Sequence, residues 1–207
     1  MTDSSEIYKK YYQEYQAQLS KVDFESIKHK LGILSDSDRM FIPFFNQRFF
    51  VSSAGVRDAS DHSPDYGVSV ILYKYILSCP SEPHYDPKWT AFKDFKRVSH
   101  FTNVNYFSSD TEKVIEKHFS GRLKELKKAC IELAGFYHKT ETVYDLSMQF
   151  DALPRISLLL LFNDGDEDFP AKCTVLFQKH TEYYLDPESL AMTSAYLAKS
   201  LIKQVRP

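Results

Sequence analysis

The last third of the chain contains the pattern that most constrains its fold. Apolar residues alternate with polar ones from Tyr144 to Asp151, which predicts a strand with one face in water. The run from Ile156 to Phe162 is almost entirely apolar and predicts a central strand covered on both faces. A third strand is predicted over Cys173–Phe177, after the polar turn Asn163–Asp168. Residues 143–177 are therefore expected to form a mainly antiparallel sheet.

Helices are predicted before and after these strands in the sequence. The N-terminal segment 4–31 contains two, and the second has Gly32 in a position to cap its end. The middle segment 67–135 is also read as mostly helical, and Ser109 and Glu112 have the spacing of a capping box within it. Asp186 and Pro187 are a suitable cap and first residue for a closing helix over 187–204.

A β-hairpin is expected at about 40–51, with Asn46-Gln47 as its turn. Pro43 cannot donate a ladder hydrogen bond, which favours an edge position for its strand. The stretch Ser52–Tyr66 is small and polar and is expected to be a loop. Helices and hairpins are thus segregated along the 207 residues, which predicts a single α+β domain rather than a doubly wound fold.

Charge, cysteine usage and hydropathy exclude several classes of protein. The formal charge of -2 and the pI near 6.4 argue against a nucleic-acid partner. The three cysteines, Cys79, Cys130 and Cys173, form no C-x-x-C spacing for a local zinc, iron–sulphur or thioredoxin-like site. The N-terminus lacks an apolar signal segment, and no apolar run approaches the ~20 residues of a membrane helix. We expect a cytoplasmic protein that makes no contact with membranes.

The most unusual local feature is the acidic turn, in which Asp164, Asp166, Glu167 and Asp168 crowd four carboxylates into five residues. Their mutual repulsion must be relieved by water, by a basic partner or by a hard cation. An EF-hand register fails because Val175 or Phe177 would stand where the bidentate glutamate belongs. A solvated turn and a partner-docking patch remain the main alternatives, and no metal ligands are assigned.

Three further residues are candidate binding groups. His84 lies in the proline-rich loop before Trp89, and loops of this kind often carry binding residues. Arg155 precedes the central strand and could pair with a carboxylate or an anionic ligand. His84 also has a structural interpretation as a surface histidine, and Arg155 as half of an ion pair.

No motif identifies a catalytic nucleophile or a cofactor. G-x-S-x-G, G-x-G-x-x-G and the phosphate-binding P-loop are absent, and the seven histidines include neither H-x-H nor H-E-x-x-H. Whether the protein is an enzyme is left open, because catalytic groups distant in sequence leave no local motif.

The C-terminal third resembles the bacterial and archaeal domain-of-unknown-function family 3786. The similarity rests on Asp151 and Leu153-Pro154-Arg155, the run Gly165–Ala171, Leu176-Phe177, and Trp89 with Phe92 upstream. The resemblance implies domains found largely in anaerobes and sometimes joined to iron–sulphur segments, so a partner would be an iron–sulphur or redox protein. The chain departs from the expected pattern at Gln178, where the resemblance suggests Asp, and this further weakens a carboxylate metal site.

Two functions follow from these observations. The first is a non-catalytic binding or accessory module that uses the acidic turn and the Trp89 loop as contact surfaces. The alternative is an enzyme that binds a small molecule or cofactor in a pocket formed by His84, Trp89, Arg155 and the acidic turn.

Overall fold

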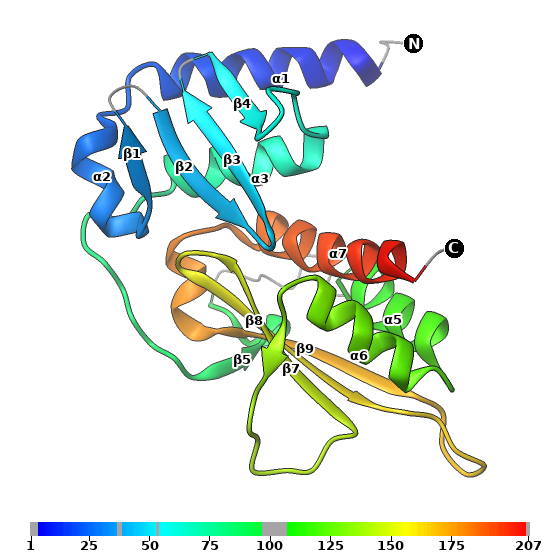
Figure 1. Ribbon diagram of the computed structural model, residues 1–207. Coiled ribbons are helices and arrows are strands. Elements are labelled where there is room, and N and C mark those ends of the chain that lie inside the picture. Colours follow the sequence, from blue (N-terminus) through cyan, green and yellow to red (C-terminus); the bar gives the residue numbers. More distant parts are fainter. Residues whose placement is uncertain (1–3, 37–38, 53, 97–106, 206–207) are drawn as a thin grey trace.

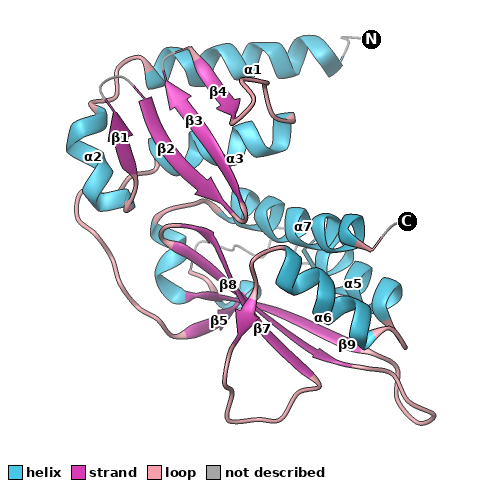
Figure 2. Cartoon of the chain, in the orientation of Figure 1, coloured by secondary structure: helices cyan, strands magenta, loops and turns pink. Residues whose placement is uncertain are grey.

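The computed structural model describes residues 4–36, 39–52, 54–96 and 107–205, and their side chains except those of residues 4–10 and 36. Two antiparallel sheets lie one above the other in Figure 1, and the C-terminal helix runs between them. Helices and strands occupy separate stretches of the chain (Figure 2), so the predicted α+β class is confirmed.

The first sheet has the strand order β1-β2-β3-β4, with β1 at Leu34–Asp36, β2 at Arg39–Phe44, β3 at Gln47–Ser52 and β4 at Gly55–Asp58. Helices α1 (Ser4–Leu19), α2 (Phe24–Leu31) and α3 (Tyr66–Leu77) surround it. The N-terminal helical segment is confirmed at these bounds. Asp23 caps α2 by accepting from the backbone N–H of Glu25 and Ser26, and Gly32 ends it at φ 67°.

The hairpin at 40–51 is confirmed, but its predicted turn is wrong by one residue. Phe44 pairs with Gln47, so the turn is Phe45-Asn46, and Phe45 adopts φ 52°. This conformation disfavours a phenylalanine, yet its ring is buried and stacks on Tyr196 at 5.5 Å. Its backbone N–H donates to the Ala152 carbonyl of the second sheet at 2.9 Å. Contacts with distant residues therefore outweigh the local turn preference.

Two other expectations for this region are corrected. Strand β2 lies inside the sheet, although β1 pairs only as far as Phe41, so Pro43 has a neighbouring strand on one side alone. The stretch Ser52–Tyr66 is not entirely loop, because it contains β4 paired with β3. A strand of four residues carries too few alternating side chains to be visible in sequence.

The second sheet has the order β5-β9-β8-β7-β6. Its strands are β5 (Trp89–Ala91), β6 (Phe136–Tyr137), β7 (Leu146–Leu153), β8 (Ile156–Asn163) and β9 (Lys172–Gln178). The predicted sheet is confirmed for β7, β8 and β9, with β8 in the centre. The two short edge strands, β5 and β6, lie in or next to the middle segment that was expected to be helical.

Helices α5 (Lys113–Phe119) and α6 (Leu123–Glu132) pack against β9 and β7 of this sheet, and α7 (Pro187–Gln204) packs against both helices. A 3₁₀ turn η1 (Phe92–Asp94), a π-helical turn η2 (Ser108–Glu112) and a 3₁₀ helix η3 (Lys179–Tyr183) complete the described elements. Asp186 caps α7, as predicted from the sequence. Its carboxylate also pairs with Lys74 of α3 at 3.2 Å.

Glu112 does not form the predicted capping box. Its carboxylate accepts from the backbone N–H of Val175 at 3.1 Å, and Glu116 does the same for Cys173 at 2.9 Å. Strand β5 covers only residues 176–178 of β9, so these two amides lie along an unpaired strand edge. The two carboxylates therefore take the place of a neighbouring strand.

A single hydrophobic cluster joins the two sheets. It includes Ile42 and Phe49 of the first sheet, Met148 and Leu160 of the second, and Leu197 of α7 between them. Among the residues described, no helix combines the length and the apolar character needed to cross a bilayer.

Candidate functional site

The acidic tip, residues 164–171, is the loop that joins β8 to β9 and projects from the lower sheet in Figure 1. Asp164 accepts hydrogen bonds from the backbone N–H of Gly121 at 2.7 Å and of Gly165 at 2.8 Å. Asp166 accepts from those of Asp168 at 2.9 Å and Phe169 at 2.7 Å. Two of the four predicted carboxylates thus fix the shape of the loop.

The other two carboxylates point to solvent. Glu167 and Asp168 are exposed, and their side chains bond to none of the described residues. The neighbouring Phe169 ring is 71% exposed although it is large and apolar. A loop held in shape by hydrogen bonds therefore presents one aromatic ring directly after two exposed carboxylates.

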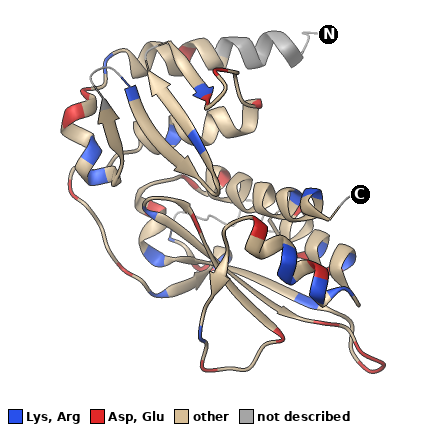
Figure 3. Ribbon diagram, viewed as in Figure 1, with Lys and Arg blue, Asp and Glu red and all other residues tan. Residues whose placement is uncertain are grey.

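A second loop, residues 138–145, is fastened to the acidic tip. Asp145 accepts from the backbone N–H of Asp164 at 2.8 Å, and its own N–H donates to the side chain of Asn163 at 3.3 Å. Val143 at the end of this loop is 90% exposed. Acidic residues collect at this end of the molecule in Figure 3.

A hollow of about 670 Å³ lies where the acidic tip meets the sheet. Four carboxylates and one lysine line it together with Phe169: Glu116, Asp145, Asp164, Asp166 and Lys172. Among the described residues, no three His, Cys, Asp or Glu side chains are grouped closely enough to hold a metal ion. The chemistry of the hollow suits an organic cation, such as a lysine or arginine side chain.

Arg155 lies at the opposite end of β8 from the acidic tip. Its Nε donates to the Lys30 carbonyl at 3.1 Å and its Nη2 to the His29 carbonyl at 3.0 Å. These carbonyls end α2, so the guanidinium caps a helix C-terminus. This structural role differs from both the ion pair and the ligand contact expected from the sequence.

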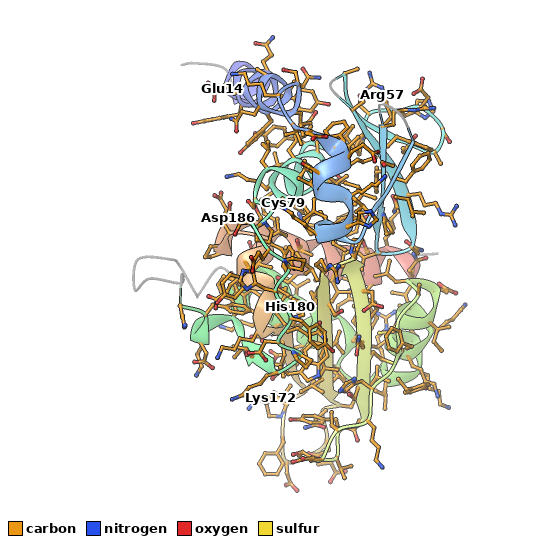
Figure 4. All side chains as sticks on the ribbon, turned by 90° about the vertical axis from the view of Figure 1, so that its left-hand side faces the viewer. Glu14, Arg57, Cys79, Lys172, His180 and Asp186 are labelled. Carbon is orange, nitrogen blue, oxygen red and sulfur yellow. The ribbon has the colours of Figure 1, made fainter. Side chains whose placement is uncertain are left out.

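His84 is also used within the fold. Its ring stacks on Tyr183 with centroids 3.9 Å apart, and its backbone N–H donates to the Tyr184 hydroxyl at 2.9 Å. In the same loop, residues 80–87, Tyr85 is 78% exposed and lies 5.6 Å from the ring of His180. The labelled His180 lies well above Lys172 in Figure 4, so this loop and the acidic tip occupy different parts of the molecule.

Trp89 takes part in a hydrogen-bond chain that crosses the outer face of the second sheet. Its indole Nε1 donates to His138 Nε2 at 3.2 Å, and His138 Nδ1 bonds Gln149 at 3.0 Å. An indole can only donate, so Nε2 of His138 is the acceptor of this bond. Gln149 in turn donates to Asp151 at 3.2 Å.

This chain joins the two edges of the sheet. Trp89 belongs to β5 at one edge and His138 follows β6 at the other, while the buried Leu159 lies on the same face between them. Sequence reasoning singled out Trp89 but missed His138 and Gln149, because nothing local indicates that the two edges meet. Of the expected pocket, Arg155 and the acidic tip lie at opposite ends of β8, so the fold does not bring all four groups together.

A family model described as Domain of unknown function (DUF3786) matches residues 23–200. The chain belongs to the DUF3786 family. The match begins at the cap of α2 and ends within α7, so it includes both sheets and every candidate residue above. No curated protein and no solved structure matches the chain. The family resemblance expected from the C-terminal third is confirmed.

Proposed function

We propose that this DUF3786 protein is a non-catalytic binding module whose acidic tip docks a protein partner with a basic surface. The observation that carries the proposal is the exposed Phe169 next to the exposed carboxylates of Glu167 and Asp168, on a loop whose shape is fixed by Asp164 and Asp166. A preordered loop loses little conformational entropy on binding, which favours its use as a recognition element.

The hollow beside Phe169 supports a basic partner. A lysine or arginine side chain entering it would meet Asp145 and Asp164 and could lie against the Phe169 ring. Val143 on the adjoining loop adds a second apolar contact. Exposed apolar groups surrounded by charge are typical of protein interaction sites.

The family resemblance suggests which partner to look for. In a bacterial or archaeal cell, an iron–sulphur or redox protein would hold any cluster itself, because this chain has no C-x-x-C motif. The three cysteines are unpaired, which agrees with the cytoplasmic, reducing compartment that we propose. The aromatic loop has a smaller part in this proposal than the sequence suggested, because His84 and Trp89 are engaged within the fold.

The experiment is site-specific photocrosslinking in the native host, with a photoreactive amino acid at position 169. The tip variant is E167Q/D168N/F169S. It is compared with the control D61N/E82Q/L34S, which removes an equal number of negative charges and one exposed apolar side chain from other parts of the surface. The crosslinked partner is then purified and titrated with each variant.

We expect the tip variant to bind the purified partner about tenfold more weakly and the control to bind like the wild type, with affinity that falls as salt rises. Equal affinity of the wild type and the tip variant would overturn the proposal, as would a partner with an acidic contact surface.

A further inference from the structure

A second hollow, far from the acidic tip, lies between α1, β4 and the start of α3. It has a volume of about 440 Å³, within the range of small-molecule sites. Its lining includes the hydrogen-bonding side chains of Tyr12, Gln13, Gln16, Arg57 and Ser63. Among the side chains that the structure describes, no carboxylate lines it, whereas acidic side chains line the hollows beside α7 and the acidic tip. In a protein of net charge -2, this hollow carries one positive charge.

Arg57 supplies that charge and is held in position. Its Nη1 donates to the Val56 carbonyl at 3.4 Å and to the Ser63 hydroxyl. The guanidinium is partly buried and pairs with none of the described carboxylates. Its Nε and Nη2 bond none of the residues that the structure describes, and this is the edge that a carboxylate or phosphate binds through two parallel hydrogen bonds.

The acidic residues nearest in sequence do not neutralise Arg57. Asp58 accepts from the backbone N–H of Ser60 at 2.8 Å and of His62 at 2.9 Å, so its carboxylate shapes the following loop. Glu14 of α1 lies across the view from Arg57 in Figure 4. A partly buried cation without a counter-ion is unfavourable, and a bound oxyanion would relieve this.

Polar side chains converge on the backbone of Gly55, beside the hollow that Arg57 lines. Gly55 has φ 121°, and a Cβ there would lie 3.0 Å from both Tyr12 Oη and Gln16 Nε2, and 3.4 Å from Tyr73 Oη. The Tyr73 hydroxyl is fully buried and has no hydrogen-bond partner among the described residues. Three polar groups from two helices therefore converge where the backbone carries no side chain.

We propose that this hollow binds a small organic oxyanion, a hydroxy acid or a phosphate ester, with Arg57 as its anchor. Tyr12 and Gln13 face the uncharged, hydroxyl-bearing part of the ligand. The site is separate from the acidic tip, so it goes beyond the docking function and can fail independently of it.

The test is calorimetric titration of the full chain with glycerol 3-phosphate and with malate, at ionic strength held constant with potassium chloride. We expect one-to-one, saturable binding of at least one probe. R57Q is expected to weaken binding about tenfold, and R48Q, which removes an exposed arginine of the same sheet, to leave it within about twofold.

A second variant keeps the test decisive if R57Q does not fold. Q13E places a carboxylate at the exposed rim of the hollow, where it supplies an internal counter-charge, and is expected to abolish binding without changing the circular dichroism spectrum. The proposal is overturned if neither probe saturates, if R57Q and R48Q weaken binding equally, or if folded Q13E binds like the wild type.

Discussion

Ala134 and Gly135 follow α6, and their backbone conformations are the reverse of what their residue types favour. Ala134 has a φ of 62°, a positive value that glycine adopts more easily. The φ of Gly135 is not positive. Gly135 is required for space instead, because a Cβ there would lie 2.6 Å from Phe150 Cε1 and 2.8 Å from the Cys130 carbonyl oxygen. Gly135 is therefore required by packing and not by a positive φ.

Exchanging the two residue types should have opposite effects on stability. A134G removes left-handed strain and is expected to raise the free energy of unfolding by about 0.5–1 kcal/mol. G135A forces a Cβ against Phe150 and is expected to lower it by about 1–3 kcal/mol. Chemical denaturation of both variants checks this, and equal or reversed effects would contradict the geometry.

Asp186 makes stability depend on pH. Burial raises the pKa of Asp186, but hydrogen bonds from Ser189 and Lys74 outweigh this and bring the pKa below its ordinary value of 3.8. Its contribution is therefore present above that value and is lost as the pH falls through the lowered pKa. D186N keeps a helix cap but loses the ion pair with Lys74.

At pH 7, D186N is expected to be about 0.5–1 kcal/mol less stable than the wild type. The difference should shrink toward zero as Asp186 of the wild type becomes protonated in acid. Denaturation curves of both proteins from pH 7 downward measure this, and a pH-independent difference would show that the ion pair does not contribute.

At the scale of elements, the open edge of β9 depends on two glutamates from the helical layer. Removing the Glu116 carboxylate leaves the Cys173 N–H buried without an acceptor, so E116A is expected to cost about 1–3 kcal/mol. E116Q retains an acceptor oxygen and should cost less. Hydrogen exchange at the Cys173 amide should accelerate in E116A and change less in E116Q, and equal acceleration would refute this role.

Sequence patterns predicted those elements whose signals are local. Strands β7 and β8 are long enough to show their period, and Asp23, Gly32 and Asp186 are local caps. The two to four residues of β4, β5 and β6 are held by partners far along the chain and show no pattern. The Phe45 turn was misplaced for the same reason, since Tyr196 and Ala152 decide its conformation.

The same distinction separates the candidate sites. The acidic tip is one continuous stretch and was visible in sequence, whereas the hollow at Arg57 is assembled from α1, β4 and α3. The bond between Trp89 and His138 likewise requires two sheet edges to meet. Motif spacing reveals a site only when neighbouring residues form it.

At the scale of the whole molecule, the shared hydrophobic cluster predicts one cooperative unit. The slowest amides of β3 and of β8 should exchange with the same free energy of opening, equal to that of global unfolding. Native-state hydrogen exchange across a denaturant series measures both values. Two distinct plateaus would mean that the sheets unfold as separate domains.

The position of α7 between the sheets has a consequence for biosynthesis. Leu190, Leu197 and Leu201 are buried in the shared cluster, yet they are made after every strand of both sheets. On the ribosome, both sheets therefore lack part of their core until Leu201 has emerged from the exit tunnel, and their exposed apolar surface can aggregate with other chains. Until α7 has emerged, the apolar faces that it covers are exposed, and chaperones that bind apolar surface would protect them.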